Sequence, residues 1–250
     1  MTSNRFLLIL ISLVSFLPLL RAEAPPEGVF SFRTLGAGVS IEGLFYSSGG
    51  KAIPVRVSTE TRSVYYTYKG PHDKLGFFRQ IPGPDGKPIQ QPVAAVNLTG
   101  AGNRPLLIFL NHPTVPGTYA VRPFSDSTKD VPPGGYRFVN FTTRKIAIVF
   151  GKQKLLIQSG EQVIVKGEEG EASPSTEVRV FGVVLNDEVR GIYSNIWEYN
   201  PQNRSIVLIS PSLENATGAK VKCISENINQ IPDDPEPNAA NGGANAGAAR

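Results

Sequence analysis

The chain between Val29 and Ser225 consists of short runs rich in Val, Ile, Phe, Tyr and Thr, separated by Gly, Pro, Asn and Asp. Runs of this length and composition predict β-strands, and helix signals are almost absent. Gly49-Gly50 and Asp85-Gly86 are expected to form tight hairpin turns. The first half is expected to contain strands at 29–33, 52–57, 63–68, 93–97, 106–110 and 119–124. The second half is expected to contain strands at 135–141, 145–150, 154–157, 162–165, 178–185, 192–197, 205–210 and 220–224. This density of strands and turns favours an all-β protein made of two-sheet antiparallel sandwiches.

Several predicted strands are apolar on both faces, namely 106–110, 146–150 and 206–209. A sandwich of about 100 residues covers only one face of each sheet with its partner sheet, so the second apolar face needs another cover. Other strands alternate, and Arg137, Val139 and Phe141 share one face. We therefore expect either an interface between two domains of this chain or an apolar patch that meets another protein.

Two segments of the chain resemble each other. Residues 103–126 align without a gap with residues 203–226 at an offset of 100, and both begin with Asn-Arg and end with an acidic residue. Further landmarks occur in the same order: Phe32 and Leu35 match Phe138 and Phe141, Gly50-Lys51 matches Gly151-Lys152, and Lys69-Gly70 matches Lys166-Gly167. The order predicts a tandem duplication of one sandwich domain, while convergence of two similar β segments is the alternative.

The N-terminus carries Arg5, an apolar run over 6–20 and then small residues, which is typical of a secretory signal peptide. We expect cleavage after Ala22, because cleavage after Ala24 would leave Pro25 at the new N-terminus. The apolar run is shorter than the roughly 20 residues that a helix needs to span a bilayer, so a retained membrane anchor is the weaker alternative. The protein is thus expected outside the cytoplasm, in the periplasm or secreted, with no permanent membrane span in the mature chain.

Three further segments follow from composition. The first sandwich is predicted at 23–126 and the second at 127–228, with the boundary at a polar stretch that leads to Pro132-Pro133. Residues 229–250, rich in Asp, Pro, Asn, Ala and Gly, are expected to form a disordered tail.

Charge and cysteine content narrow the range of partners. The net charge is +4, and removal of Arg5 and Arg21 with the signal peptide leaves it nearly balanced. Because Lys and Arg are scattered singly, no nucleic-acid partner is expected. Cys223 is the only cysteine, so no internal disulfide can form, and we interpret it as a small buried side chain.

The sequence offers little for catalysis or metal binding. The only histidines, His72 and His112, lie in predicted turns, and no nucleophile elbow, zinc spacing, calcium loop or phosphate-binding glycine loop is present. The acidic run 168–171 is interpreted as a solvated loop, with a weak cation site as the alternative. We therefore predict no catalytic, cofactor-binding or metal-binding residues and no cofactor, which favours a protein that is not an enzyme.

The aromatic run Tyr65-Tyr66-Thr67-Tyr68 is the best candidate for ligand binding. Alternation puts Tyr66 and Tyr68 on one face with Val64, and Tyr65 on the other. Tyrosines on an open sandwich face can stack on sugar rings, whereas packing across strands is the alternative role. Sequons begin at Asn97, Asn140, Asn203 and Asn215, but they do not establish a glycosylating host.

The run 131–141, Val-Pro-Pro-Gly-Gly-Tyr-Arg-Phe-Val-Asn-Phe, followed by a strand and Gly151-Lys152, resembles exported bacterial immunoglobulin-like domains of unknown function. The resemblance implies an extracytoplasmic all-β module and provides no catalytic residues. The function expected is a non-enzymatic binding or structural module whose partner is a protein or a cell-envelope component. The alternative is a carbohydrate-binding protein or a carbohydrate-active enzyme with a site assembled only in space.

Overall fold

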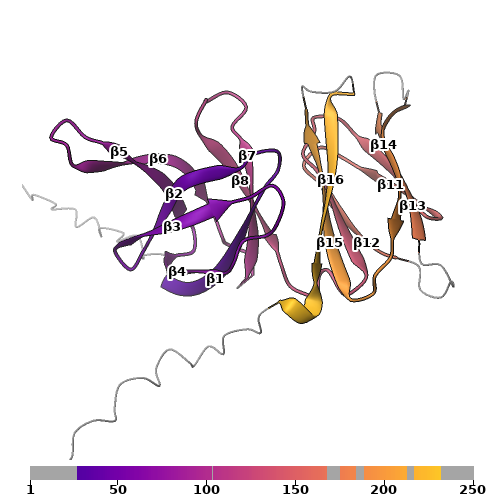
Figure 1. Cartoon of the computed structure of the whole chain (residues 1–250), viewed down its shortest axis with the longest axis horizontal. Helices are drawn as coiled ribbons and strands as arrows, with labels where there is room; N and C mark the ends of the chain where they lie inside the picture. The colour runs from indigo at the N-terminus through magenta and orange to yellow at the C-terminus, as the bar shows by residue number, and fades with distance from the viewer. Residues whose placement is uncertain (1–26, 103, 168–174, 184–188, 213–216, 232–250) are drawn as a thin grey trace, which may run out of the picture.

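The computed structural model describes residues 27–102, 104–167, 175–183, 189–212 and 217–231. The predicted signal peptide 1–22, the acidic run 168–171, the sequon at Asn215 and residues 232–250 of the predicted tail lie outside these ranges. The described residues form sixteen β-strands and one short 3-10 helix, Ile228–Gln230. The prediction of an all-β protein with two sandwiches is confirmed (Figure 1).

The first sandwich contains eight strands in two four-stranded sheets. Its strands are β1 (Glu27–Gly36), β2 (Ile41–Ser48), β3 (Lys51–Val57), β4 (Tyr66–Pro71), β5 (Leu75–Pro82), β6 (Pro88–Val96), β7 (Pro105–Asn111) and β8 (Tyr119–Ser125). One sheet has the order β4-β1-β7-β8 and the other has the order β3-β2-β5-β6. All neighbouring strands are antiparallel except β1 and β7, which are parallel.

The second sandwich repeats this arrangement. Its strands are β9 (Gly135–Asn140), β10 (Ile146–Phe150), β11 (Gln153–Ile157), β12 (Gln162–Lys166), β13 (Ser175–Val183), β14 (Val189–Glu198), β15 (Asn203–Pro211) and β16 (Ala219–Asn227). The sheet orders are β12-β9-β15-β16 and β11-β10-β13-β14, again with one parallel pair, β9 and β15. Each strand of the second sandwich therefore occupies the place of the strand eight earlier.

The strand register corrects the landmark matches that were drawn from β1. Arg33 pairs with Leu106 in the first sandwich, and Arg137 pairs with Ile206 in the second. Since Leu106 and Ile206 are related by the offset of 100, Arg33 corresponds to Arg137 and Phe32 to Tyr136. The sequence matches of Phe32 with Phe138 and of Leu35 with Phe141 were both wrong by two residues, because both strands carry aromatic side chains at alternate positions.

Two strands of the first sandwich escaped the sequence pattern, β2 and β5. Both contain irregular pairing: β2 shifts register against β3 between Ile41 and Leu44, and β5 shifts against β6 between Phe77 and Phe78. In the first case the extra residue lies in β2 itself, where it interrupts the alternation of apolar and polar positions; in the second case the extra residue is Val93 of the partner strand β6. The expected strand 63–68 was also misplaced, since β4 begins only at Tyr66 and residues 58–65 form a connection.

Tight turns lie where glycine predicted them. Gly49 and Gly50, between β2 and β3, have φ values of 55° and 76°. Positive φ at both central residues is what a two-residue hairpin turn that follows the strand twist requires, and glycine accepts it without a Cβ clash. Gly86, in the turn between β5 and β6, likewise has φ of 75°.

Each sandwich has its own apolar core between its two sheets. The first core is centred on Phe32, Tyr46, Phe77 and Phe109, whose rings make edge-to-face contacts. The second is centred on Phe138 and Phe150, with Tyr136 and Trp197 stacked beside them. A chain without a disulfide thus obtains its stability from two aromatic-rich cores.

Candidate functional site

The two sandwiches share a third apolar core, which lies between them. It is formed by the outward faces of sheets β4-β1-β7-β8 and β12-β9-β15-β16. From the first sandwich come Leu35, Ala37, Leu106, Ile108, Leu110 and Phe124; from the second come Val139, Phe141, Ile206, Leu208 and Ile224. Two of the three strands predicted to be apolar on both faces, 106–110 in β7 and 206–209 in β15, lie here, and their second faces cover each other. The third, 146–150 in β10, lies in the other sheet of the second sandwich and does not reach this core.

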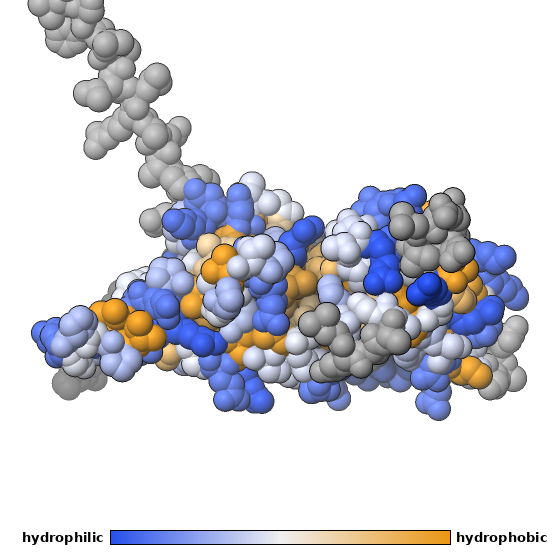
Figure 2. Space-filling model, turned by 90° about the horizontal axis from the view of Figure 1, so that it is seen from above, coloured by the Kyte–Doolittle hydropathy of each residue, from blue (hydrophilic) through white to orange (hydrophobic). Residues whose placement is uncertain are grey.

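This interface has an approximate twofold character. The strand register relates Leu35 to Val139 and Ala37 to Phe141. The offset of 100 relates the remaining interface residues in pairs: Leu106 and Ile206, Ile108 and Leu208, and Phe124 and Ile224. Equivalent surface patches of the two sandwiches therefore meet, as the two subunits of a symmetric dimer do. Figure 1 shows β7 and β8 facing β15 and β16, and Figure 2 shows hydrophobic residues in the seam between the two lobes.

Charged side chains continue the apolar interface at one end. We call this the interdomain ionic cluster; its members are Arg33, Arg62, Asp126, Arg137, Arg204 and Glu226. Arg33 of β1 donates to Asp126 and also to Glu226 of the second sandwich, with Nη1 2.6 Å from Oε2. Arg204 of β15 donates to Glu226 (2.7 Å) and to the carbonyl of Asp126 (2.6 Å). The ion pairs therefore cross from one sandwich to the other.

The connection at 58–65 reaches across the same seam. Arg62 lies with Nε 3.4 Å from Oε1 of Glu226, and its Nη1 is 3.4 Å from the carbonyl oxygen of Ile224 in β16. Glu60 pairs with Lys222 of β16. The loop is fixed to its own sheet, because Thr34 and Ser63 exchange two hydrogen bonds of 2.8 and 3.0 Å. In the second sandwich the equivalent strands β11 and β12 are joined by residues 158–161, so the long connection that crosses the seam is present only in the first sandwich.

Electrostatics keep the Glu226 carboxyl ionised. Burial alone would raise its pKa, but the hydrogen bond from Arg33 and the charges of Arg62, Arg33 and Arg204 outweigh burial and lower it. Burial likewise acts to lower the pKa of Arg33, yet the hydrogen bond to Glu226 and the charge of Asp126 raise it. A glycosidase needs one carboxyl with a raised pKa as general acid. Glu226 has the opposite shift, and both Glu226 and Asp126 accept hydrogen bonds from the buried Arg33, so the geometry of this pair suits the holding of arginines.

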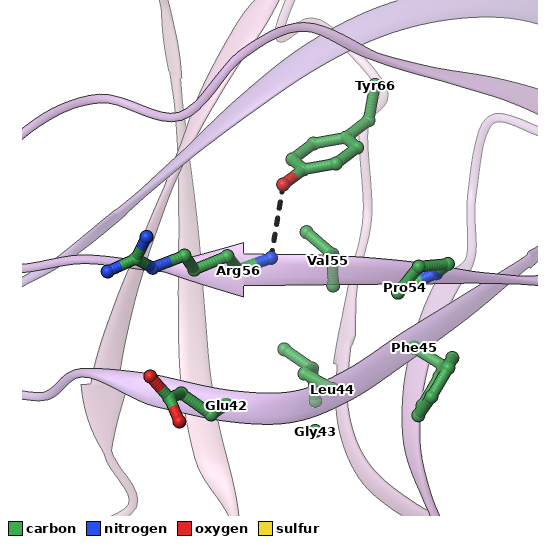
Figure 3. A pocket seen from close by; sticks show the side chains of 8 residues that line it. All are labelled: Glu42, Gly43, Leu44, Phe45, Pro54, Val55, Arg56 and Tyr66. Atoms are coloured by element: carbon green, nitrogen blue, oxygen red, sulfur yellow. Dashed lines mark hydrogen bonds between the residues drawn. The ribbon is translucent and has the colours of Figure 1, made fainter.

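A second feature is an open groove on the first sandwich, of about 510 Å³ (Figure 3). It is lined by Glu42, Gly43, Leu44, Phe45, Pro54, Val55, Arg56 and Tyr66. The groove lies where β2 carries the two residues Glu42 and Gly43 opposite the single residue Arg56 of β3. Gly43 has φ of 66°, in the left-handed region that glycine adopts without a Cβ clash.

The groove combines apolar and charged side chains. Phe45 stacks on Phe78 with ring centroids 6.0 Å apart, and the hydroxyl of Tyr66 accepts a hydrogen bond of 3.1 Å from the backbone N–H of Arg56. Figure 3 shows the side chains of Glu42 and Arg56 at one end and Phe45 with Pro54 at the other. The pairing of β10 with β11 is regular from Ile146 to Phe150, so the second sandwich lacks this bulge.

The structure separates the three tyrosines singled out in the sequence. Tyr68 is buried in the first core, and Tyr66 packs on Phe32 and Tyr46 while its hydroxyl reaches the groove. Tyr65 lies on the opposite face, beneath the guanidinium groups of Arg33 and Arg104, at 4.9 and 4.2 Å from the ring centroid. The alternation predicted for these tyrosines is confirmed, but they do not form a shared open platform for sugars.

The two histidines lie at opposite ends of one sheet. His72 follows β4 near the start of β1, where Glu27 pairs with Pro71. His112 follows β7 near the end of β1, where Gly36 pairs with Phe109. Ten extended residues separate these ends by about 30 Å, so the histidines cannot serve one catalytic site. In the part of the chain that the structure describes, no three His, Cys, Asp or Glu side chains are grouped to hold a metal ion.

Cys223 and the sequon residues Asn140 and Asn97 differ in their burial. Cys223 is half-buried against the second core, and burial raises the pKa of its thiol. Asn140 is fully buried and its Oδ1 accepts hydrogen bonds from Thr142, so this sequon is closed to a glycosyltransferase in the folded protein. Asn97 is exposed, with its Oδ1 bonded to the N–H of Thr99 (2.7 Å).

Sequence reasoning found the apolar faces but missed the interdomain ionic cluster. A signal was present in the aligned segments, which carry arginine at 104 and 204 and an acidic residue at 126 and 226. Among the described residues, no helix has the length and hydrophobicity to cross a membrane. Comparison of the sequence with protein-family models and with curated proteins finds no match.

Proposed function

We propose that this chain is an exported, non-enzymatic binding or structural module that acts in the periplasm or outside the cell. The observation that carries this proposal is the union of two complete sandwiches through an apolar and ionic interface. Such an interface favours a rigid body over two hinged halves, and a rigid β body suits a spacer or a scaffold for binding. The sequence pattern of residues 1–22 supports export.

The resemblance to immunoglobulin-like exported domains and the origin by duplication are part of the same proposal. Identical sheet orders in the two sandwiches and the correspondence of Arg33 with Arg137 support a duplication. An ancestral sandwich that paired with a second copy through the outer face of its β1-β7 sheet would explain why equivalent patches now meet.

Export is tested by expressing the full chain with its own N-terminus in a bacterial host. We expect the protein in the periplasm or medium, with Glu23 as its first residue by N-terminal sequencing and intact mass. Full-length chain found in the membrane fraction would instead support a retained anchor, and uncleaved chain in the cytoplasm would refute export.

Rigidity is tested by solution X-ray scattering of the same protein, compared with the scattering calculated from one body with the two sandwiches in contact. We expect agreement once the two terminal segments are represented as an ensemble. Scattering that requires separated, independently moving sandwiches would contradict the module proposed here.

A second candidate function is carbohydrate binding, and the groove beside the β2 bulge is the observation that favours it. Phe45, Pro54 and Tyr66 give an apolar surface, while Glu42 and Arg56 provide an acceptor and a donor for hydroxyl groups. Calorimetric titration with a panel of soluble oligosaccharides tests this function. Binding that Phe45→Ala abolishes and Val115→Ala, an exposed site in the β7–β8 connection, leaves intact would establish it.

A further inference from the structure

The charges of the interdomain ionic cluster do not balance. Four arginines are almost inaccessible: Arg33, Arg137 and Arg204 are 5%, 3% and 1% exposed, and the side chain of Arg62 is 5% exposed. Guanidinium groups stay protonated in proteins, so they bring four positive charges. Asp126 and Glu226 bring two negative charges. Among the described residues nearby, the exposed Asp130 adds one negative charge and the half-buried Arg104 one positive charge, so within this part of the chain the excess remains.

The hydrogen bonds of these arginines also leave donors without acceptors. Arg33 and Arg204 use the carboxylate oxygens at short distances. Among the described residues, Arg62 makes polar contacts of 3.4 Å or more to Glu226, Asp126 and a carbonyl oxygen. Arg137 donates through Nη1 to the carbonyl of Ser125 (2.6 Å), which carries no compensating charge. The buried Nε groups of Arg62 and Arg137 donate to no partner among the described residues.

Unmet donors in a buried cationic cluster carry a large desolvation cost. That cost is removed by an anion, because the planar guanidinium fork matches the oxygens of phosphate, sulfate and carboxylate groups. The cluster is reachable from solvent along its edge, where Glu226 has a side chain 17% exposed and Tyr65 and Arg104 are half-buried. Arg62 and Arg137 lie beside the same stretch of chain: Nε of Arg62 is 3.8 Å from Oδ1 of Asp126, and Nη1 of Arg137 is 2.6 Å from the carbonyl oxygen of Ser125.

We infer that the interdomain ionic cluster is a binding site for a tetrahedral oxyanion, a phosphate or sulfate group, held chiefly by Arg62 and Arg137. The anion bridges the sandwiches, because Arg62 belongs to the first and Arg137 to the second. The inference is independent of export and of carbohydrate binding in the groove. The group comes either as a free inorganic ion or as a monoester on a larger molecule.

The test uses the full chain at pH 7 in chloride buffers of constant ionic strength. Inorganic phosphate and phenyl phosphate are titrated by calorimetry, and the thermal midpoint is followed in parallel. We expect saturable binding and a rise of the midpoint with concentration, as any ligand selective for the folded state produces. Equal or tighter binding of phenyl phosphate identifies a monoester site, whereas binding of inorganic phosphate alone identifies a site for the free ion.

Two variants locate the site. Arg62→Lys keeps the charge but loses the bidentate fork, and Arg62→Gln loses both; we expect affinity to fall about tenfold or more in each. Arg190→Gln, which changes an exposed arginine of β14 in the sheet that does not face the seam, is the matched control and should bind as the parent does. Near-ultraviolet circular dichroism verifies that each variant is folded. No saturable effect beyond chloride, or unchanged affinity in folded Arg62→Lys, would overturn the inference.

Discussion

At the scale of single residues, Glu226 connects the two sandwiches more than any other carboxylate described here. It accepts hydrogen bonds from Arg33 of the first sandwich and Arg204 of the second, and it lies 3.4 Å from Arg62. Glu226→Gln removes the charge that compensates three buried guanidinium groups. Removal of one partner from a buried ionic network typically costs about 3 to 5 kcal/mol. We expect a loss of that order in urea denaturation at pH 7.

The control for that substitution is Glu60→Gln. Glu60 also pairs across the seam, with Lys222, but it lies at the exposed surface. Exposed ion pairs contribute little because water screens them. We expect the control to unfold at nearly the parent's urea concentration, and a cost equal to that of Glu226→Gln would argue against the importance of burial.

Glu226 also predicts that the stability of the folded protein depends on pH. The folded-state pKa of Glu226 lies below its reference value of 4.5, so the ionised carboxyl favours the folded protein. This contribution is complete above pH 4.5 and is lost as the pH falls through the lower, folded-state pKa. Urea midpoints measured between pH 7 and pH 3 should fall on the acid side, and Glu226→Gln should flatten that fall. Parallel pH profiles of parent and variant would contradict this assignment.

At the scale of elements, the bulge in β2 is the local feature that shapes the groove. Gly43 has φ of 66° with open space around its missing Cβ, so a side chain there meets backbone strain without a clash. Gly43→Ala should cost about 1 to 2 kcal/mol. Gly76→Ala in β5 is matched, because its Cβ also meets open space while its φ is ordinary. Urea denaturation of both should show a clear loss only for Gly43→Ala, and equal losses would refute the strain argument.

At the scale of the whole molecule, the shared core makes the sandwiches one folding unit. Ile108 is fully buried in the interface, on the outer face of β7. We expect the parent to show one calorimetric unfolding transition, because exposure of this core penalises a state with only one sandwich folded. Ile108→Asp buries an unpaired charge and should split the transition in two and enlarge the radius of gyration in scattering.

The matched control is Leu156→Asp, because Leu156 is 57% exposed on β11, away from the seam. It should unfold in one transition, as the parent does. Two transitions in the parent itself would show that the sandwiches are energetically independent.

The sequence by itself determined the fold class, most strands and the glycine turns. These follow from local properties: alternation, β-branched and aromatic composition, and positive φ at Gly49 and Gly50. It also required that the second apolar faces of β7 and β15 be covered. Only the tertiary structure decided that these faces cover each other, because pairing between distant surfaces leaves no periodic trace in the chain. Distance along the chain also hid the ionic cluster, because Arg33 and Glu226 lie 193 residues apart. The groove was missed for another reason: it is formed at a bulge of two residues, and a bulge interrupts the alternation from which strands are predicted.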